Sequence, residues 1–349
     1  ENAEQIALMG GETAERERLM DRFRALVGNW LAIMSRTKKL TFFTAGFTQA
    51  SIVFPYFVAG PAYFANLIDF GGLQQTAQAF NQVQTAFSFF IEAYGNLAEW
   101  SSVIIRLSGF AVAIKSAESV AKAPPVIALE RDGKRSQLDI AHLKVNLPQG
   151  RPLVDAEEMS LSRGDRTLVM GPTGSGKSTL FRAIGGIWPF GSGTITIPHN
   201  AKLLVLPQRP YLPIGSLLAA ISYPAVPNAF APDKVSQVLV AVGMPGYVSR
   251  LYEEAHWNRM LSLGEQQRLA VARAILHAPD YLLLDEATAS LDEASEAELY
   301  RLLNELLPGT AILSIGHRAT LRRFHQRLWQ IVREGDRQWV RERKLEPAE

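Results

Sequence analysis

A glycine-rich segment between a strand pattern and a helix pattern could hold phosphate groups. An apolar strand pattern at Thr167–Met170 leads into Gly-Pro-Thr-Gly-Ser-Gly-Lys-Ser, and a helical run follows at Thr179–Ile184. Glycines let backbone N–H groups curl around phosphate oxygens at a helix N-terminus. We expect Lys177 to reach the β- and γ-phosphates and the Ser178 hydroxyl to bind Mg²⁺. The predicted nucleotide-binding residues here are Gly171, Pro172, Thr173, Gly174, Ser175, Gly176, Lys177, Ser178 and Thr179.

Two adjacent carboxylates follow a second buried-strand pattern. Tyr281–Leu284 is apolar and runs directly into Asp285 and Glu286. We expect Asp285 to act at the Mg²⁺ ion and Glu286 to polarise an attacking water molecule. The alternative, a strand that ends in an ordinary acidic turn, is disfavoured by the phosphate-binding loop upstream.

A third segment, Leu-Ser-Leu-Gly-Glu-Gln-Gln-Arg from Leu261, directly precedes a helix predicted at Leu269–Leu276. Ser262 reads as an N-cap and Glu265 completes a capping box. The helix N-terminus is also an anion site. With the phosphate loop, this segment and the Asp-Glu strand in that order, the domain resembles the ABC family of ATPases. The family signature is commonly LSGGQ, so LSLGE is a variant that retains Ser262 and Gly264, which are expected to hold a γ-phosphate.

The resemblance implies further site residues. Gln208 resembles the glutamine that contacts Mg²⁺ and water, although it could be an ordinary surface residue. Asp292 lies in a segment, Ser-Leu-Asp, that resembles the loop touching the opposite subunit. His317 resembles the histidine at the γ-phosphate, against a purely structural alternative. The implied catalytic residues are therefore Gln208, Glu286 and His317, with Ser262, Gly264, Glu265 and Asp292 contacting nucleotide and Ser178, Gln208 and Asp285 at the metal.

The same resemblance implies the fold and a partner. The expected fold class is an α/β P-loop ABC ATPase domain, a mixed sheet flanked by helices with a helical subdomain, preceded by all-α transmembrane helices. In this family each ATP lies between the phosphate loop of one subunit and the signature of another. A second half-transporter subunit is therefore expected, in a homodimer, with ATP and Mg²⁺ as cofactors.

The elements upstream of these motifs have a membrane composition. Residues 40–105 contain no Lys or Arg, and we predict spans at about 40–65 and 76–105, with Pro55 kinking the first span and a hinge between the two. Arg36, Lys38 and Lys39 precede the first span and Arg106 follows the second, so the positive-inside rule places both outer ends in the cytoplasm.

Several details of this hairpin remain open from the residues alone. Glu92 and Glu99 lie seven positions apart, on one helix face, and either face a protein interior or lie in water at the cytosolic end. Residues 1–39 suggest amphipathic helices on a wet surface. Ala123-Pro124-Pro125 indicates a linker, which divides the chain into a membrane part at 1–122 and a nucleotide-binding domain at 123–349.

Composition excludes some functions. The chain has no cysteine, so disulfides, Cys-ligated zinc and thiol nucleophiles are excluded, and a net charge of +2 gives no sign of a nucleic-acid partner. A soluble ABC ATPase would lack the apolar stretch 40–105, which contains no Lys or Arg, whereas a regulatory P-loop membrane protein would lack the LSLGE segment. The residues therefore favour an ATP-hydrolysing transporter subunit over both alternatives.

Three strings narrow the resemblance further: the first twelve residues, Gln208–Pro213, and Gly316–Arg318 with the residues after it. Together they resemble the peroxisomal fatty-acyl half-transporters and their bacterial BacA-like relatives, the first string matching an EAA-like motif. This implies four further spans upstream, a bacterial inner-membrane location with the ATPase domain in the cytoplasm, and a peptide, cobalamin-like or acyl-CoA-like solute.

One departure from the family pattern concerns the adenine base. ABC domains usually stack adenine on an aromatic residue 25 to 30 positions before the loop lysine, but residues 131–180 contain no Phe, Tyr or Trp. Leu147 and Pro148 lie at the matching positions. The sequence therefore predicts that the triphosphate dominates affinity and that GTP competes with ATP within about tenfold.

Overall fold

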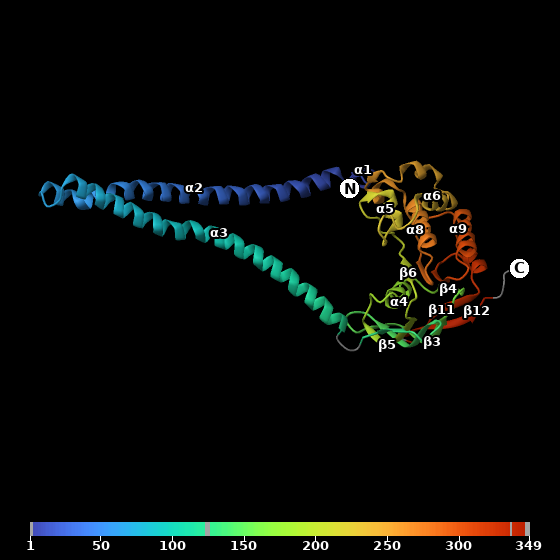
Figure 1. The fold of residues 1–349 in the computed structure, drawn as a ribbon. Coiled ribbons are helices and arrows are strands. Elements are labelled where there is room, and N and C mark those ends of the chain that lie inside the picture. Colours follow the sequence, from blue (N-terminus) through green and yellow to red (C-terminus); the bar gives the residue numbers. More distant parts are fainter. Residues whose placement is uncertain (1–2, 123–125, 336, 346–349) are drawn as a thin grey trace. The chain divides into compact units, whose positions relative to one another are not determined.

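The chain divides into two compact units. A computed structural model describes residues 3–122, 126–335 and 337–345, with the side chains of all of them except residues 4, 90–92 and 120–122. The first unit is Glu1–Val112 and the second is Ala113–Glu349, so the division falls inside one long helix. The predicted linker Ala123–Pro125 and the Glu92 carboxylate lie outside the described residues. Figure 1 shows the elements of both units.

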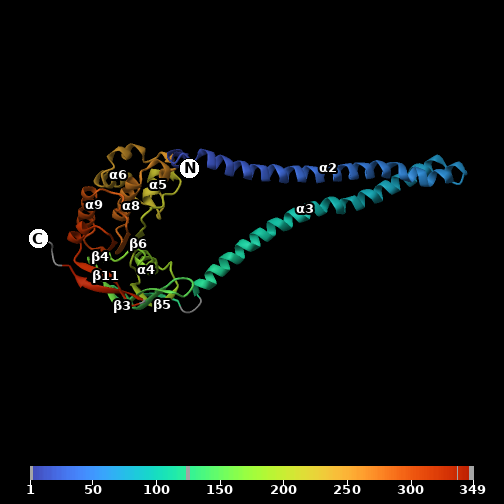
Figure 2. The ribbon, with the colours of Figure 1, turned by 180° about the vertical axis from the view of Figure 1, so that it is seen from behind.

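The first unit is a helical hairpin. It comprises α1 (Ala3–Leu8), α2 (Glu12–Phe64) and the greater part of α3 (Phe70–Lys122), as far as Val112. The two long helices have 53 residues each, or roughly 80 Å, far more than the roughly 30 Å of a hydrocarbon core. Both are long and apolar enough to cross a membrane. Most of the amphipathic segment predicted at residues 1–39 joins the first predicted span in one helix, α2 (Figure 2). This helix continues through Pro55 and Pro61.

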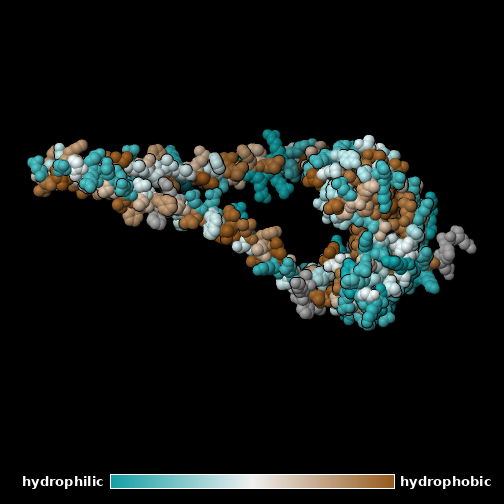
Figure 3. Space-filling view, in the orientation of Figure 1, coloured by the Kyte–Doolittle hydropathy of each residue, from teal (hydrophilic) through white to brown (hydrophobic). Residues whose placement is uncertain are grey.

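The described helices of the hairpin bury very little. Only Ser51, Pro55 and Ala77 are buried among the described side chains of α2 and α3, and Figure 3 shows apolar residues along both helices. The helices meet near the turn, where the rings of Phe54 and Phe80 lie 5.4 Å apart. Packing within this unit therefore leaves most of its apolar surface exposed.

The second unit contains a mixed sheet. Ten strands of its described part are arranged in the order β1-β5-β2-β3-β12-β11-β4-β10-β9-β6. They are β1 (Ala128–Asp132), β2 (Leu138–Asn146), β3 (Pro152–Leu161), β4 (Arg166–Met170), β5 (Gly191–Pro198), β6 (Leu203–Leu206), β9 (Tyr281–Asp285), β10 (Ala311–Ile315), β11 (Arg327–Glu334) and β12 (Arg337–Lys344). Strands β7 (Gly215–Ser216) and β8 (Glu254–Ala255) form a separate antiparallel pair.

The sheet has a parallel region and an antiparallel region. Strands β4, β10, β9 and β6 are parallel neighbours, so their carboxyl ends meet at one edge, where ligands of α/β sheets bind. Strands β2, β3 and β5 pair antiparallel. The helices are α4 (Lys177–Ile184), α5 (Leu217–Ser222), α6 (Pro232–Ala241), η1 (Pro245–Arg250), α7 (Trp257–Met260), α8 (Leu263–His277), α9 (Glu293–Leu306) and η2 (Ala319–Phe324). This is the mixed α/β domain with a helical subdomain that the sequence predicted.

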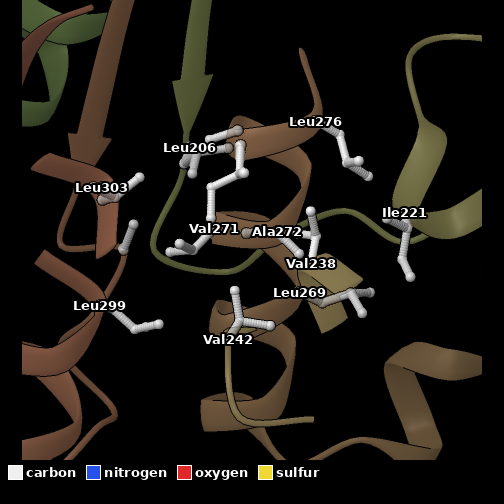
Figure 4. Packing of buried hydrophobic residues seen from close by; sticks show 14 of the residues in the cluster. Leu206, Ile221, Val238, Val242, Leu269, Val271, Ala272, Leu276, Leu299 and Leu303 are labelled. Atoms are coloured by element: carbon white, nitrogen blue, oxygen red, sulfur yellow. The ribbon is translucent and has the colours of Figure 1, made fainter. Parts of the chain in front are cut away.

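The central strands are buried on both faces, which explains their continuous apolar sequences. Alternate residues of β9 enter different clusters: Leu282 and Leu284 pack with α5, α6, α8 and α9, whereas Tyr281 and Leu283 pack with α4 and the antiparallel strands. Figure 4 shows part of the first cluster, with Val271 of α8 near Leu206 of β6. Two cores thus fix both the strand ends and the helices that start beside them.

Candidate nucleotide-binding site

The loop between β4 and α4 is shaped by glycine. Gly174 and Gly176 have φ values of +76° and +85°, in the left-handed region that favours glycine. A Cβ at Gly176 would lie 2.8 Å from Cγ of Leu153, so no larger residue fits without displacing that side chain. Helix α4 begins at Lys177, one residue later than this turn. The backbone N–H groups at its first turn are therefore available to an anion, as the sequence predicted.

Lys177 is held at this loop by backbone carbonyls. Its Nζ donates to the carbonyl oxygens of Gly171 and Pro172, each at 2.9 Å. Burial lowers the pKa of Lys177, and the nearby carboxylates of Glu286 and Asp285 oppose that shift. The ammonium is thus placed in a partly desolvated position where attraction to phosphate oxygens is strong.

Ser178 and Asp285 are brought together from α4 and the end of β9. Ser178 Oγ donates to Asp285 Oδ1 at 2.8 Å, so both oxygens can reach the roughly 2.1 Å coordination distance of one Mg²⁺ ion. Burial raises the pKa of Asp285, and the hydrogen bond from Ser178 opposes that rise. Two hard oxygen donors beside a phosphate-binding loop are the donor set that Mg²⁺ uses with nucleotides, so the residues fit the metal.

Glu286 lies between Gln208 and His317. Its Oε2 accepts from Gln208 Nε2 at 3.1 Å, and its Oε1 lies 3.0 Å from His317 Nε2. The backbone of Glu286 has φ +51°, a left-handed conformation uncommon for a residue other than glycine. Such conformations cost energy and cluster at functional sites. The end of β9 therefore places the Glu286 carboxylate beside Gln208 and His317, the two residues predicted to act with it.

One pocket of 650 Å³ collects these side chains, a volume suited to a nucleotide-sized ligand. Predicted site residues line it from four segments of the chain: the phosphate loop with α4, Gln208, the end of β9, and His317. Those lining residues are Thr173, Gly174, Ser175, Gly176, Lys177, Ser178, Thr179, Gln208, Asp285, Glu286 and His317. Gly171 and Pro172 contribute through the carbonyls that hold Lys177.

The pocket also includes residues that the sequence reasoning missed. Leu153, Arg182, Pro207 and Arg209 line it. Arg182 follows Ser178 by one helical turn, a spacing that places both on one face and could have revealed it. Arg209 directly follows Gln208 in the chain. Leu153 had no such signal, because its position depends on how β3 passes beneath the loop.

One of the two residues predicted to contact the base lines the pocket. Leu147 lines the pocket, and Leu153 adds a second apolar side chain. Pro148 is not among the lining residues, and none of the residues that line the pocket in the described part of the chain is a Phe, Tyr or Trp. An apolar surface without a π-face is thus what the chain offers at this position.

The signature residues lie at the N-terminus of α8, apart from this pocket. Ser262 is the N-cap, and its hydroxyl accepts from the Glu265 N–H while Glu265 Oε2 accepts from the Ser262 N–H, the predicted capping box. Tyr247 donates to Glu265 Oε1 at 2.8 Å. Burial opposes ionisation of Glu265, but hydrogen bonds from Ser262 and Tyr247 outweigh it and lower the pKa. Helix α8 begins at Leu263, six residues before the predicted start.

Asp292 also lies outside the residues that line the pocket. It caps α9, and its Oδ1 accepts from the Ser295 N–H at 2.9 Å. The predicted site residues thus fall into two groups, one around the pocket and one formed by Ser262, Gly264, Glu265 and Asp292. A single chain does not bring the second group into the first.

Two models of known protein families match this chain, one in each of its two parts. The ABC transporter family matches residues 154–289, and ABC transporter transmembrane region 2 matches residues 1–64. A solved structure of a bacterial Atm1-family ABC exporter with ATP bound has the same fold, with a TM-score of 0.73 and 19% identity over 94% of this chain and 59% of that chain.

Sequence relatives extend the match along nearly the whole chain. An uncharacterised ABC transporter ATP-binding protein of Haemophilus influenzae is 38% identical, over 97% of this chain and 56% of its own length. A similar protein of Synechocystis is 35% identical, with 96% and 52% covered, and ABC transporter D family member 2 of Arabidopsis thaliana is 31% identical, with 95% and 56% covered. The chain spans about half the length of these relatives. Its two parts are therefore similar to the ATP-binding domain and to a transmembrane region of ABC transporters.

Proposed function

We propose that this chain binds and hydrolyses ATP and that the released energy drives a solute across a membrane. The observation that carries the proposal is the single pocket in which Lys177, Ser178, Asp285, Glu286 and His317 meet from separate segments. These side chains supply a phosphate-binding cation, two metal ligands and a carboxylate with its partners. That is the set of groups which phosphoryl transfer to water requires.

Each residue has a defined role in this proposal. The α4 N-terminus and Lys177 bind the triphosphate, and Ser178, Asp285 and Gln208 hold Mg²⁺, which neutralises phosphate charge when bound. Glu286 orients the attacking water and accepts its proton. His317, at hydrogen-bonding distance from Glu286 Oε1, orients that carboxylate and contacts the γ-phosphate.

The second group of residues serves a second nucleotide. Ser262, Gly264, Glu265 and Asp292 lie outside the pocket, on a helix N-terminus suited to anions. We infer that they complete the pocket of an opposite subunit in a homodimer. ATP then closes the dimer, and hydrolysis reopens it and moves the membrane helices between two states.

The long apolar helices and the sequence relatives support a location in a membrane. We propose that α2 and α3 carry the fifth and sixth spans, after four spans upstream, in a bacterial inner membrane with the ATPase domain in the cytoplasm. We also assign the chain to the group of the peroxisomal fatty-acyl half-transporters and their bacterial BacA-like relatives, and its similarity to ABC transporter D family members supports this proposal. The solute that we propose is a peptide, a cobalamin-like molecule or an acyl-CoA-like molecule.

Substitution of Glu286 by Gln tests the hydrolytic role. Glu286→Gln keeps the side-chain shape but cannot accept a proton, so kcat for ATP hydrolysis should fall about 100-fold or more while ATP binding persists. Glu305→Gln, an exposed change on α9, is the matched control and should leave kcat within twofold. Near-parental turnover by Glu286→Gln would refute the assignment.

The alternative is a regulatory ABC-type ATPase that moves no solute. ATP-dependent accumulation of a candidate solute in vesicles containing the full-length protein supports transport. Robust ATP hydrolysis that is unaffected by each of the three solute classes, with no accumulation, would favour the regulatory reading.

A further inference from the structure

A buried glutamine joins three parts of the nucleotide-binding domain. Gln267 lies on α8, five residues after the N-cap, and its exposed fraction is 0%. Its Nε2 donates to the carbonyl oxygen of Gln208 at 3.1 Å, and its Oε1 accepts from the Ser290 N–H at 3.0 Å. The Gln267 side chain therefore links α8 to the backbone of Gln208, whose side chain contacts Glu286, and to the segment formed by residues 288–291.

The 288–291 segment is held from another direction by Arg318. Its guanidinium donates to the carbonyl oxygens of Leu291 and Ala289, at 2.8 and 3.4 Å. It also pairs with the buried carboxylate of Glu296 at 3.1 Å. The other Glu296 oxygen accepts from the Thr288 hydroxyl at 2.6 Å.

The two attachments lead to different residues of the pocket. Gln267 leads to Gln208, whereas Arg318 directly follows His317, and both Gln208 and His317 contact the Glu286 carboxylate. Asp292, one of the residues outside the pocket, directly follows the 288–291 segment. If Gln208 or His317 moves relative to Glu286, the 288–291 segment must move with it or a buried hydrogen bond must break. Breaking such a bond costs free energy.

We propose that Gln267 and Arg318 are positioning residues that tie the 288–291 segment to Gln208 and His317. Neither residue is among those that line the nucleotide pocket. Each acts through the segment that presents Asp292 to the opposite subunit. Their role is to make that segment follow the state of the pocket. This inference rests on the proposed ATP hydrolysis by a dimer.

Removing the Gln267 hydrogen bonds should lower turnover rather than affinity. Gln267→Met keeps a similar volume but removes both bonds, so we expect kcat for ATP hydrolysis to fall about tenfold in the full-length protein. The Kd for ATP should change less than twofold, because the residues that contact phosphate are untouched. Gln267→Leu also lacks both hydrogen-bonding groups and adds no charge to this buried position, so it substitutes for the Met variant if that variant does not fold.

Gln137 is the matched control in the same domain. Its amide also makes one bond in each direction, because Nε2 donates to Asp139 Oδ1 at 2.8 Å and Oε1 accepts from the Ser162 hydroxyl at 2.9 Å. None of these three residues lines the pocket or lies in the 288–291 segment. Gln137→Met therefore loses a comparable pair of bonds and should leave kcat within twofold.

A double-mutant cycle tests whether the two residues act on one segment. Arg318→Lys keeps the charge beside Glu296 but cannot span both carbonyls, and we expect a loss of about fivefold in kcat. The double variant should be clearly less impaired than the product of the two single effects, because both release the same segment. Parental kcat in Gln267→Met, an equal loss in Gln137→Met, or fully multiplicative effects would overturn the proposal. Glu286→Gln would still be inactive in that case, so the proposed ATP hydrolysis would stand.

Discussion

The helical hairpin and the nucleotide-binding domain are built on opposite principles. In the domain, central strands and helices bury both faces of the sheet in two clusters. In the hairpin, large apolar side chains such as Phe57 and Phe64 are about four-fifths exposed, at 78% and 83%. The difference shows that the domain supplies its own core, whereas the hairpin must have its apolar surface covered from outside.

This contrast explains why the two regions differ in what they can do alone. A self-contained core fixes strand ends and helix starts, so the predicted site residues from distant segments meet in one pocket. A hairpin without a core fixes only the direction of its helices. We therefore attribute chemistry to the domain, and we infer that lipid and further helices complete the membrane part.

The largest effect should come from matched truncations in the two regions. Leu269, on α8, is fully buried, so Leu269→Ala should lower the free energy of unfolding by about 2–5 kcal/mol. Phe57→Ala should change it by less than about 0.5 kcal/mol, because exposed positions contribute little. Urea unfolding of the detergent-solubilised protein, followed by tryptophan fluorescence, compares them. Equal losses would mean that the hairpin has a core of its own.

A pH effect of intermediate size should arise in the domain. Burial lowers the pKa of His325 to about 4, whereas an unfolded histidine titrates near 6.5. Its Nδ1 lies 2.8 Å from the Leu321 carbonyl oxygen and its Nε2 lies 2.9 Å from Ser314 Oγ, an arrangement that suits the neutral ring. Since the unfolded chain binds the extra proton, His325 contributes stability above pH 6.5 that is lost as pH falls towards 4.

We therefore expect a loss of about 2 kcal/mol in unfolding free energy between pH 7.5 and pH 5 from this residue alone. His325→Asn should be less stable but should have a correspondingly flatter pH profile. Urea unfolding of both proteins at the two pH values measures the difference. Identical slopes would show that His325 does not titrate differently in the folded domain.

The smallest effect concerns the base. Leu147→Tyr should add a stacking surface worth on the order of 1 kcal/mol and tighten ATP binding about fivefold. In the unmodified pocket GTP should compete with ATP within about tenfold. Titration of both nucleotides against the Glu286→Gln variant tests this, and a hundredfold preference for ATP would indicate that another residue reads the base.

Sequence patterns were sufficient where one segment carries its own signal. The phosphate loop, the Asp285-Glu286 strand end and the capping box at Ser262 each combine a local structural pattern with a chemical one. The structure places the first two in one pocket with Gln208 and His317. The mixed sheet and helical subdomain that the resemblance implied are confirmed by the fold.

Other features depend on tertiary packing and left no local trace. Leu153 reaches the pocket only because β3 passes beneath Gly176, and the link from Gln267 to Ser290 joins residues distant in sequence. The uninterrupted α2 helix was also not predicted, because the change from charged to apolar residues near Lys39 does not interrupt helical backbone. These positions are set by the assembled core rather than by propensity.

The central claim, that two chains complete each other's nucleotide sites, can be tested by cross-linking. The chain has no native cysteine, so Thr173→Cys in the phosphate loop and Leu263→Cys in the signature introduce the only two thiols. With ATP and Mg²⁺ in the Glu286→Gln background, mild oxidation should give a dimer-sized band on a non-reducing gel, because the two segments would lie within disulfide distance across the dimer. ADP should not support it. A dimer band of equal intensity without nucleotide, or none with ATP, would contradict the account.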